Sequence, residues 1–163
     1  TVFETNSPSM DIQVASNFER LIYDLNDFDD IETKDVMIKI KDEGKYIFAK
    51  NRLEKIRKDF LSESMNEEEV IETIRNIYNK YKVILDPHTA IGLGALNKIN
   101  IEGDNIVLAT AHPCKFPDAI DKSISIKPSL PSELQYIMDK KEYYDIVPNN
   151  VSKTKQYIKD KLK

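Results

Sequence analysis

The chain is short of cysteine, histidine and glycine, and each shortage excludes a class of site. Cys114 is the sole cysteine among 163 residues, which excludes an internal disulfide and a cysteine-rich zinc site. Two histidines, His88 and His112, leave few ligand combinations for a metal. The four glycines do not cluster, so the chain lacks the glycine-rich turn that normally holds a phosphate through backbone N–H groups.

Charge and long apolar runs are also limited. Charged residues make up 32% of the chain, but they nearly balance at a net charge of -4, unlike the basic surface of a nucleic-acid-binding protein. No apolar stretch is long enough to span a bilayer, and the first residues show no secretory signal. We therefore expect a cytoplasmic protein with neither a nucleic-acid nor a membrane partner. The 40% of hydrophobic residues suffices for a core.

Apolar residues at helical spacing predict most of the secondary structure. The strongest pattern covers residues 66–81, where Asn66 and Glu69 have the spacing of a capping box. An acidic stretch at residues 26–30 is typical of a solvated break between helices. Further helices are predicted over residues 9–25, 31–41, 51–61, 132–139 and 151–162.

A similar arrangement occurs twice in the middle of the chain. The apolar run 83–85 precedes Asp-Pro-His-Thr-Ala, and the apolar run 106–108 precedes Ala-Thr-Ala-His-Pro. Proline suits the first turn of a helix, so each run is expected to lead into one. Residues 106–108 are predicted to form a strand of an α/β sheet, whereas 83–85 fits a short extended segment. The predicted fold is α/β and rich in helices, with few strands.

Reactive side chains gather after the predicted strand, and each has an alternative explanation. Ligands bind beyond the carboxyl ends of strands in open α/β sheets, where Thr110 is expected, but the local pattern favours Thr110 as a helix cap. His88, His112 and Asp86 would make a metal site only with a third strong ligand, so hydrogen bonding to the backbone is favoured. Cys114 fits a small half-buried residue better than a nucleophile.

Three stretches together resemble threonine synthase, an enzyme that uses pyridoxal 5'-phosphate (PLP). They are SPSMDIQVASNFERL at 7–21, DPHTAIG at 86–92 and ATAHPCKFPDA at 109–119. Their order and separation resemble the C-terminal part of that family. The resemblance implies a fold-type-II PLP lyase that converts O-phospho-L-homoserine and water to L-threonine and phosphate. It also implies that residues 1–127 belong to the large catalytic domain and that residues 128–163 form its helical tail.

The resemblance assigns possible roles to residues of the matching stretches. It places Thr110 near the pyridine nitrogen of PLP, where a neutral hydroxyl would leave that nitrogen unprotonated. It implies cofactor contacts for His112, Lys115 and His88. Four further residues match a family stretch, with a structural role equally open to them: Ser9, Asp11, Asn17 and Arg20.

The sequence departs from the family in what it lacks. None of its twenty lysines lies in the family's Schiff-base motif, and no glycine-rich loop for the cofactor phosphate is present. The resemblance places both upstream, so we expect no catalytic residue in this chain and no activity without the N-terminal half. Two alternatives stay open: an interaction or regulatory domain derived from the family, and a metal-dependent hydrolase using Asp86, His88 and His112.

Overall fold

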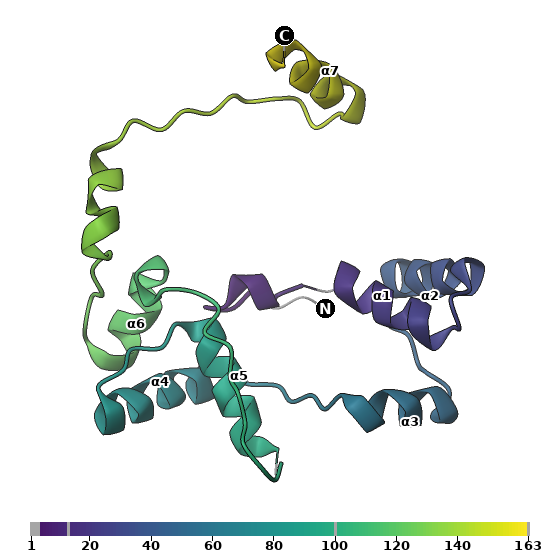
Figure 1. Cartoon of the computed structure of the whole chain (residues 1–163), viewed down its shortest axis with the longest axis horizontal. Coiled ribbons are helices and arrows are strands. Elements are labelled where there is room, and N and C mark those ends of the chain that lie inside the picture. The colour runs from purple at the N-terminus through teal and green to yellow at the C-terminus, as the bar shows by residue number, and fades with distance from the viewer. Residues whose placement is uncertain (1–3, 13, 100, 163) are drawn as a thin grey trace. The chain divides into compact units, whose positions relative to one another are not determined.

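Helices dominate the computed structural model, which describes residues 4–12, 14–99 and 101–162 (Figure 1). The chain divides into two compact units, Thr1–Ser129 and Leu130–Lys163. This division does not test the predicted assignment of residues 1–127 and 128–163 to a catalytic domain and its tail, which stays a prediction. No helix within the described ranges is long and apolar enough to cross a membrane.

The first unit contains six α-helices and two 3-10 turns among its described residues. They are η1 Pro8–Met10, α1 Ser16–Leu25, α2 Asp30–Glu43, α3 Lys50–Asp59, α4 Glu67–Tyr81, α5 Pro87–Lys98, η2 Pro113–Lys115 and α6 Pro117–Ile124. Helix α4 packs against both α5 and α6, and α1 packs against α2 and α3. The second unit contains η3 Ser132–Asp139 and α7 Val151–Lys161. The expectation of a helix-rich fold is confirmed.

Helix α1 begins later than the apolar spacing predicts. The chain forms the short turn η1, residues 11, 12 and 14 are not helical, and Ala15, whose backbone is extended, precedes the helix. Asp11 accepts hydrogen bonds from the Thr5 backbone N–H and hydroxyl, both at 2.8 Å. Such local side-chain bonds compete with helix formation, which explains the delayed start at Ser16. Gln13, inside the predicted helix, lies outside the described residues.

The break between α1 and α2 is partly buried rather than wholly solvated, which corrects the prediction. Asn26 is buried, donates to the Thr33 hydroxyl at 3.2 Å and accepts from Arg52 Nη1 at 2.7 Å. Arg52 Nη2 also lies 2.6 Å from a Glu32 carboxylate oxygen. Asp29 caps α2 by accepting the Glu32 backbone N–H at 2.9 Å. These bonds join α1, α2 and α3 at one end.

The capping box predicted at the start of α4 is confirmed. The Asn66 side chain accepts the Glu69 backbone N–H at 2.9 Å, and Glu69 accepts the Asn66 backbone N–H at 2.8 Å. Lys98 of α5 lies 2.6 Å from Glu69, and its hydrogen bond lowers the pKa of that carboxyl. The core beside this cap contains Val70, Ile74, Ala90 and Ile120. Helices α4, α5 and α6 thus share one apolar core.

The strand predicted at residues 106–108 does not form within the described part of the chain. These residues are extended, but no described backbone segment hydrogen-bonds to them. Ile106 is 89% exposed and Leu108 75% exposed, whereas Val107 is half-buried against α5. A Cβ at Gly92 would come within 3.3 Å of Val107 Cγ1, so glycine permits this close approach. An apolar extended run becomes a strand only where a neighbouring strand can pair with it.

The chain exposes more surface than a self-contained protein of its mass. The solvent-accessible area is 13076 Å². Folded monomers of this mass expose roughly 8,300 Å², and two separate compact units of these sizes would together expose about 9,700 Å². Many large apolar side chains contribute to the excess, including Phe28 and Ile31. Much apolar surface of the described residues is therefore left uncovered.

A cluster of three polar side chains ties the second unit together. Asp145 accepts a hydrogen bond from the Tyr157 hydroxyl and lies 3.0 Å from Lys161 Nζ. The bonds from Tyr157 and then Lys161 lower the pKa of Asp145. The same contacts with Asp145 raise the pKa of Tyr157 and that of Lys161. This Asp145 cluster connects α7 to the extended segment before it.

Candidate functional site

A buried carboxylate at the start of α5 organises the polar centre of the first unit. Asp86, 1% exposed, caps the helix by accepting the His88 backbone N–H at 2.9 Å. The same oxygen lies 3.1 Å from His88 Nδ1. The other carboxylate oxygen accepts the Thr89 hydroxyl. A capping aspartate followed by proline suits a helix start, so this local sequence fixes three donors around one carboxylate.

His88 joins this carboxylate to the N-terminal segment. Its Nε2 accepts the Ser9 backbone N–H at 3.3 Å, so the ring proton lies on Nδ1 and is donated to Asp86. The ring packs on Phe116, with centroids 4.7 Å apart. Both ring nitrogens are thus used within the protein. His88 is buried and in a position to hold Ser9 and Phe116 in place.

Thr89 connects the same carboxylate to Thr110. The Thr110 backbone N–H donates to Thr89 Oγ1 at 3.1 Å, while the Thr89 hydroxyl donates to Asp86. Thr110 is exposed, and its own hydroxyl has no hydrogen-bond partner in the described part of the chain. The predicted role of Thr110 as a helix cap is wrong. His112 caps the following turn instead, because its Nδ1 accepts the Cys114 backbone N–H at 3.2 Å.

The other two predicted cofactor residues lie on the exposed turn after Thr110. His112 is exposed, and only its Nδ1 is engaged in a hydrogen bond. Lys115 is also exposed, with Nζ 5.9 Å from the centre of the Phe116 ring. Phe116 therefore contacts both Lys115 and His88. The fold brings the Asp-Pro-His-Thr and Thr-Ala-His-Pro stretches together around Asp86.

Three contributors to this centre were missed in the sequence. Ser7 is fully buried, and its Oγ has no hydrogen-bond partner among the described residues. Phe116 provides the ring contact to His88, and Asn6 ties its segment to α4 by donating its backbone N–H to Glu67 at 2.9 Å. No local pattern identifies the contacts of Phe116 and Asn6, because both join residues far apart in sequence.

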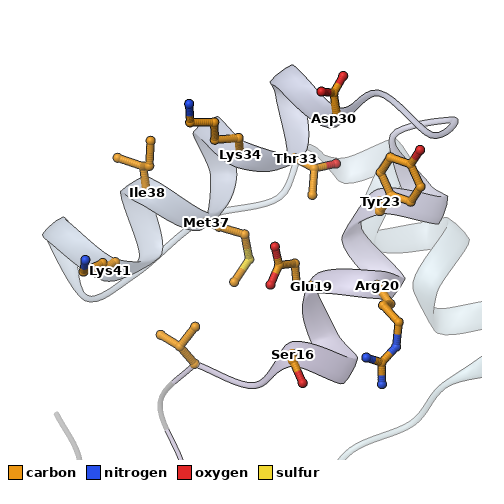
Figure 2. A pocket seen from close by; sticks show the side chains of 11 residues that line it. Ser16, Glu19, Arg20, Tyr23, Asp30, Thr33, Lys34, Met37, Ile38 and Lys41 are labelled. Atoms are coloured by element: carbon orange, nitrogen blue, oxygen red, sulfur yellow. The ribbon is translucent and has the colours of Figure 1, made fainter. Parts of the chain in front are cut away.

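The four remaining family-matched residues line two hollows. Ser9, Asp11 and Asn17 line one of about 530 Å³. Arg20 lines another of about 580 Å³ between α1 and α2. Figure 2 shows Glu19 and Met37 pointing toward one another across that space. These four residues are thus divided between two separate hollows.

The structure offers no support for a metal centre. Within the described ranges, no group of three or more His, Cys, Asp or Glu side chains is placed to hold a metal ion. Asp86 and His88 bind one another, whereas His112 binds the Cys114 backbone. The hydrolase alternative required these three side chains to converge. The described contacts instead divide them between two separate local arrangements.

Comparisons with known proteins agree with the three motifs. A family described as "Threonine synthase, C-terminal" matches residues 89–158. Threonine synthase from Pseudomonas aeruginosa is 35% identical over 161 residues, which cover 97% of this chain and 34% of that protein. Threonine synthase from Saccharomyces cerevisiae is 37% identical over 188 residues, which cover 99% of this chain and 36% of that protein.

A solved structure agrees over the same extent. The PLP-bound threonine synthase from Brucella melitensis matches 98% of this chain with a TM-score of 0.82 and 34% identity, and the match covers 35% of that protein. The chain thus spans about a third of the length of the relatives it matches. Over nearly its whole length it is similar to about a third of each of these threonine synthases, and its residues 89–158 match the C-terminal family model.

Proposed function

We propose that this chain forms one wall of the PLP crevice of a threonine synthase. The complete enzyme converts O-phospho-L-homoserine and water to L-threonine and phosphate. The observation that carries the proposal is the meeting of all three family stretches around Asp86, through Ser9, His88, Thr89 and Thr110. The N-terminal two thirds of such an enzyme would be the partner of this chain and would supply the lysine that binds the cofactor.

The residues present fit PLP on one side of its ring. When bound, PLP withdraws electrons from the substrate and so favours loss of phosphate and addition of water. Thr110 has a hydroxyl without a described partner, while its backbone is held by Thr89. That hydroxyl would donate its proton to the ring nitrogen and leave the nitrogen unprotonated.

The other predicted cofactor residues have different proposed roles. His112 and Lys115 lie on the exposed turn that follows Thr110 and would face the cofactor or substrate. His88 would act from behind, because Asp86 and Ser9 already use both of its ring nitrogens. It would keep Phe116 and the Ser9 turn in position. We assign no catalytic residue to this chain, and we propose that it is inactive alone.

The extended segment 106–108 supports the finer assignment to fold type II. We propose that it pairs with a strand from the N-terminal two thirds and so becomes part of the large-domain sheet. The exposed side chains of Ile106 and Leu108 would then be covered. Residues 1–127 would belong to that domain, and residues 128–163 would form its helical tail.

The proposal is tested by fusing this chain to the N-terminal two thirds of the Pseudomonas aeruginosa enzyme. The fusion should form threonine from O-phospho-L-homoserine when PLP is added, whereas the 163-residue chain alone should not. Thr110→Val should lower kcat by about ten- to a hundredfold, since one hydrogen bond to a charged or reacting group is lost, and Thr110→Ser should restore most of it. Turnover by the chain alone, or full activity of Thr110→Val, would refute the proposal.

A further inference from the structure

A basic hollow lies between α4 and α6, and none of its lining residues belongs to the Asp86 centre. Its volume is about 320 Å³, and none of its lining residues is acidic. Arg75, Tyr78 and Asn79 line it from α4, and Lys122 and Ser125 line it from the end of α6. All five side chains carry N–H or O–H donors. The two helices pack directly on one another, so the hollow has a fixed base (Figure 1).

One hydrogen bond anchors the Arg75 guanidinium group and leaves its terminal N–H donors without a described partner. Its Nε donates to the Ser123 carbonyl at 3.1 Å, which orients the planar guanidinium group. No hydrogen bond or ion pair engages its two terminal Nη groups within the described residues. A guanidinium held through Nε presents its remaining donors in a fixed fork, the geometry that suits phosphate oxygens.

Lys122 adds a second positive charge without a carboxylate partner. No Asp or Glu of the described chain forms an ion pair with Arg75 or Lys122, although Asp118 precedes Lys122 by one helical turn. Lys82 Nζ lies 5.2 Å from the centre of the ring of Tyr78, which is one of the lining residues. The hollow therefore has an excess of positive charge.

The C-terminal end of α6 lines the hollow and brings a partial negative charge, which the cationic side chains meet. Two carbonyls of its last turn are bonded, because Ser123 accepts from Arg75 Nε and Asp121 accepts the Ser125 N–H at 2.8 Å. The Arg75 bond thus accounts for one donor and leaves the terminal Nη groups available.

We propose that this hollow binds the phosphate group of a small phosphorylated molecule. Arg75 would bind two phosphate oxygens, and Lys122 would supply the second positive charge. Tyr78, Asn79 and Ser125 would donate to the remaining oxygens. The volume is at the lower end of the range for small-ligand sites, which fits inorganic phosphate or a small phosphate ester. The inference does not rest on the proposed function.

The test is calorimetric titration of the 163-residue chain with inorganic phosphate, sulfate and succinate at constant ionic strength. Phosphate should bind saturably and more tightly than succinate. Lys122→Gln should weaken phosphate binding about five- to tenfold, the loss expected for one charged hydrogen bond. Lys80→Gln removes the same charge from α4 at a residue outside the hollow, so it should change affinity less than twofold.

Circular dichroism separates a loss of phosphate binding from an effect of the substitution on folding. Arg75→Gln should weaken binding at least as much as Lys122→Gln, but it also removes the bond to Ser123. Lys122 makes no such bond, so its variant should keep the circular dichroism spectrum of the parent. The proposal is overturned if phosphate fails to bind, if succinate binds as well as phosphate, or if Lys80→Gln is as harmful as Lys122→Gln.

Discussion

Replacement of Asp86 by alanine tests whether this carboxylate holds the site together. The change removes the cap on the His88 N–H, which costs about 1 kcal/mol. It also leaves the His88 Nδ1–H and the Thr89 hydroxyl buried without their acceptor, at about 1–3 kcal/mol each. The total loss in unfolding free energy is about 3–7 kcal/mol, a large share of the stability of an ordinary domain.

The matched control is Asp29→Ala at the start of α2. Asp29 is also a helix cap, but it is exposed, and its side chain accepts only the Glu32 N–H at 2.9 Å. The Asp29→Ala substitution should lower the free energy of unfolding by about 1 kcal/mol. Urea unfolding followed by circular dichroism should place the Asp86→Ala midpoint about 1 M or more below that of Asp29→Ala. Equal midpoints would show that Asp86 is only a helix cap and would refute its organising role.

Three further predictions concern other parts of the chain. Because the pKa of Asp145 is lowered, the Asp145 cluster should be intact above about pH 4 and lost as the pH falls through the lowered value, which NMR titration of the carboxyl would show. Arg52→Ala should cost about 1–3 kcal/mol in urea unfolding, because it leaves the buried Asn26 oxygen without its donor. Changing Ile106 and Leu108 to lysine should alter stability by less than about 0.5 kcal/mol each and reduce self-association in sedimentation velocity, because both side chains are exposed beside an unpaired extended backbone.

Each of these predictions has a control or a contradicting result. Asp145→Asn should abolish the pH dependence of the Asp145 cluster, and an Asp145 that titrates at the ordinary value would contradict the contacts described. Arg57→Ala, on the same helix as Arg52, should change stability little, since no hydrogen bond or ion pair in the described chain involves Arg57. Val107→Lys should destabilise the chain, because Val107 packs beside Gly92, unlike its two neighbours.

Local signals were sufficient to predict the elements whose causes are local. The capping box of α4 and the proline start of α5 depend on residues within one turn, and both form as predicted. The strand at 106–108 was predicted from an apolar triplet, but a strand also requires a neighbour, and the described residues offer none. Long-range partners decide that outcome, and spacing does not reveal them.

The candidate site shows the same division between local and long-range causes. The resemblance identified the stretches that meet, but not how they meet. Thr110 was assigned as a cap from its position, whereas the His112 side chain is closer to the free N–H of the turn. The link from Thr89 to Thr110 spans 21 residues, and the link from Ser9 to His88 spans 79. Folding creates both links, so neither has a pattern in the sequence.

The central claim is that Thr110 faces the ring nitrogen of PLP once this chain is completed. A crystal structure of the fusion with the Pseudomonas aeruginosa N-terminal two thirds, grown with PLP, tests it most directly. We predict that Thr110 Oγ1 lies within about 3.2 Å of the pyridine nitrogen. A different side chain at that nitrogen, or a cofactor bound away from the turn at residues 110–116, would contradict the account.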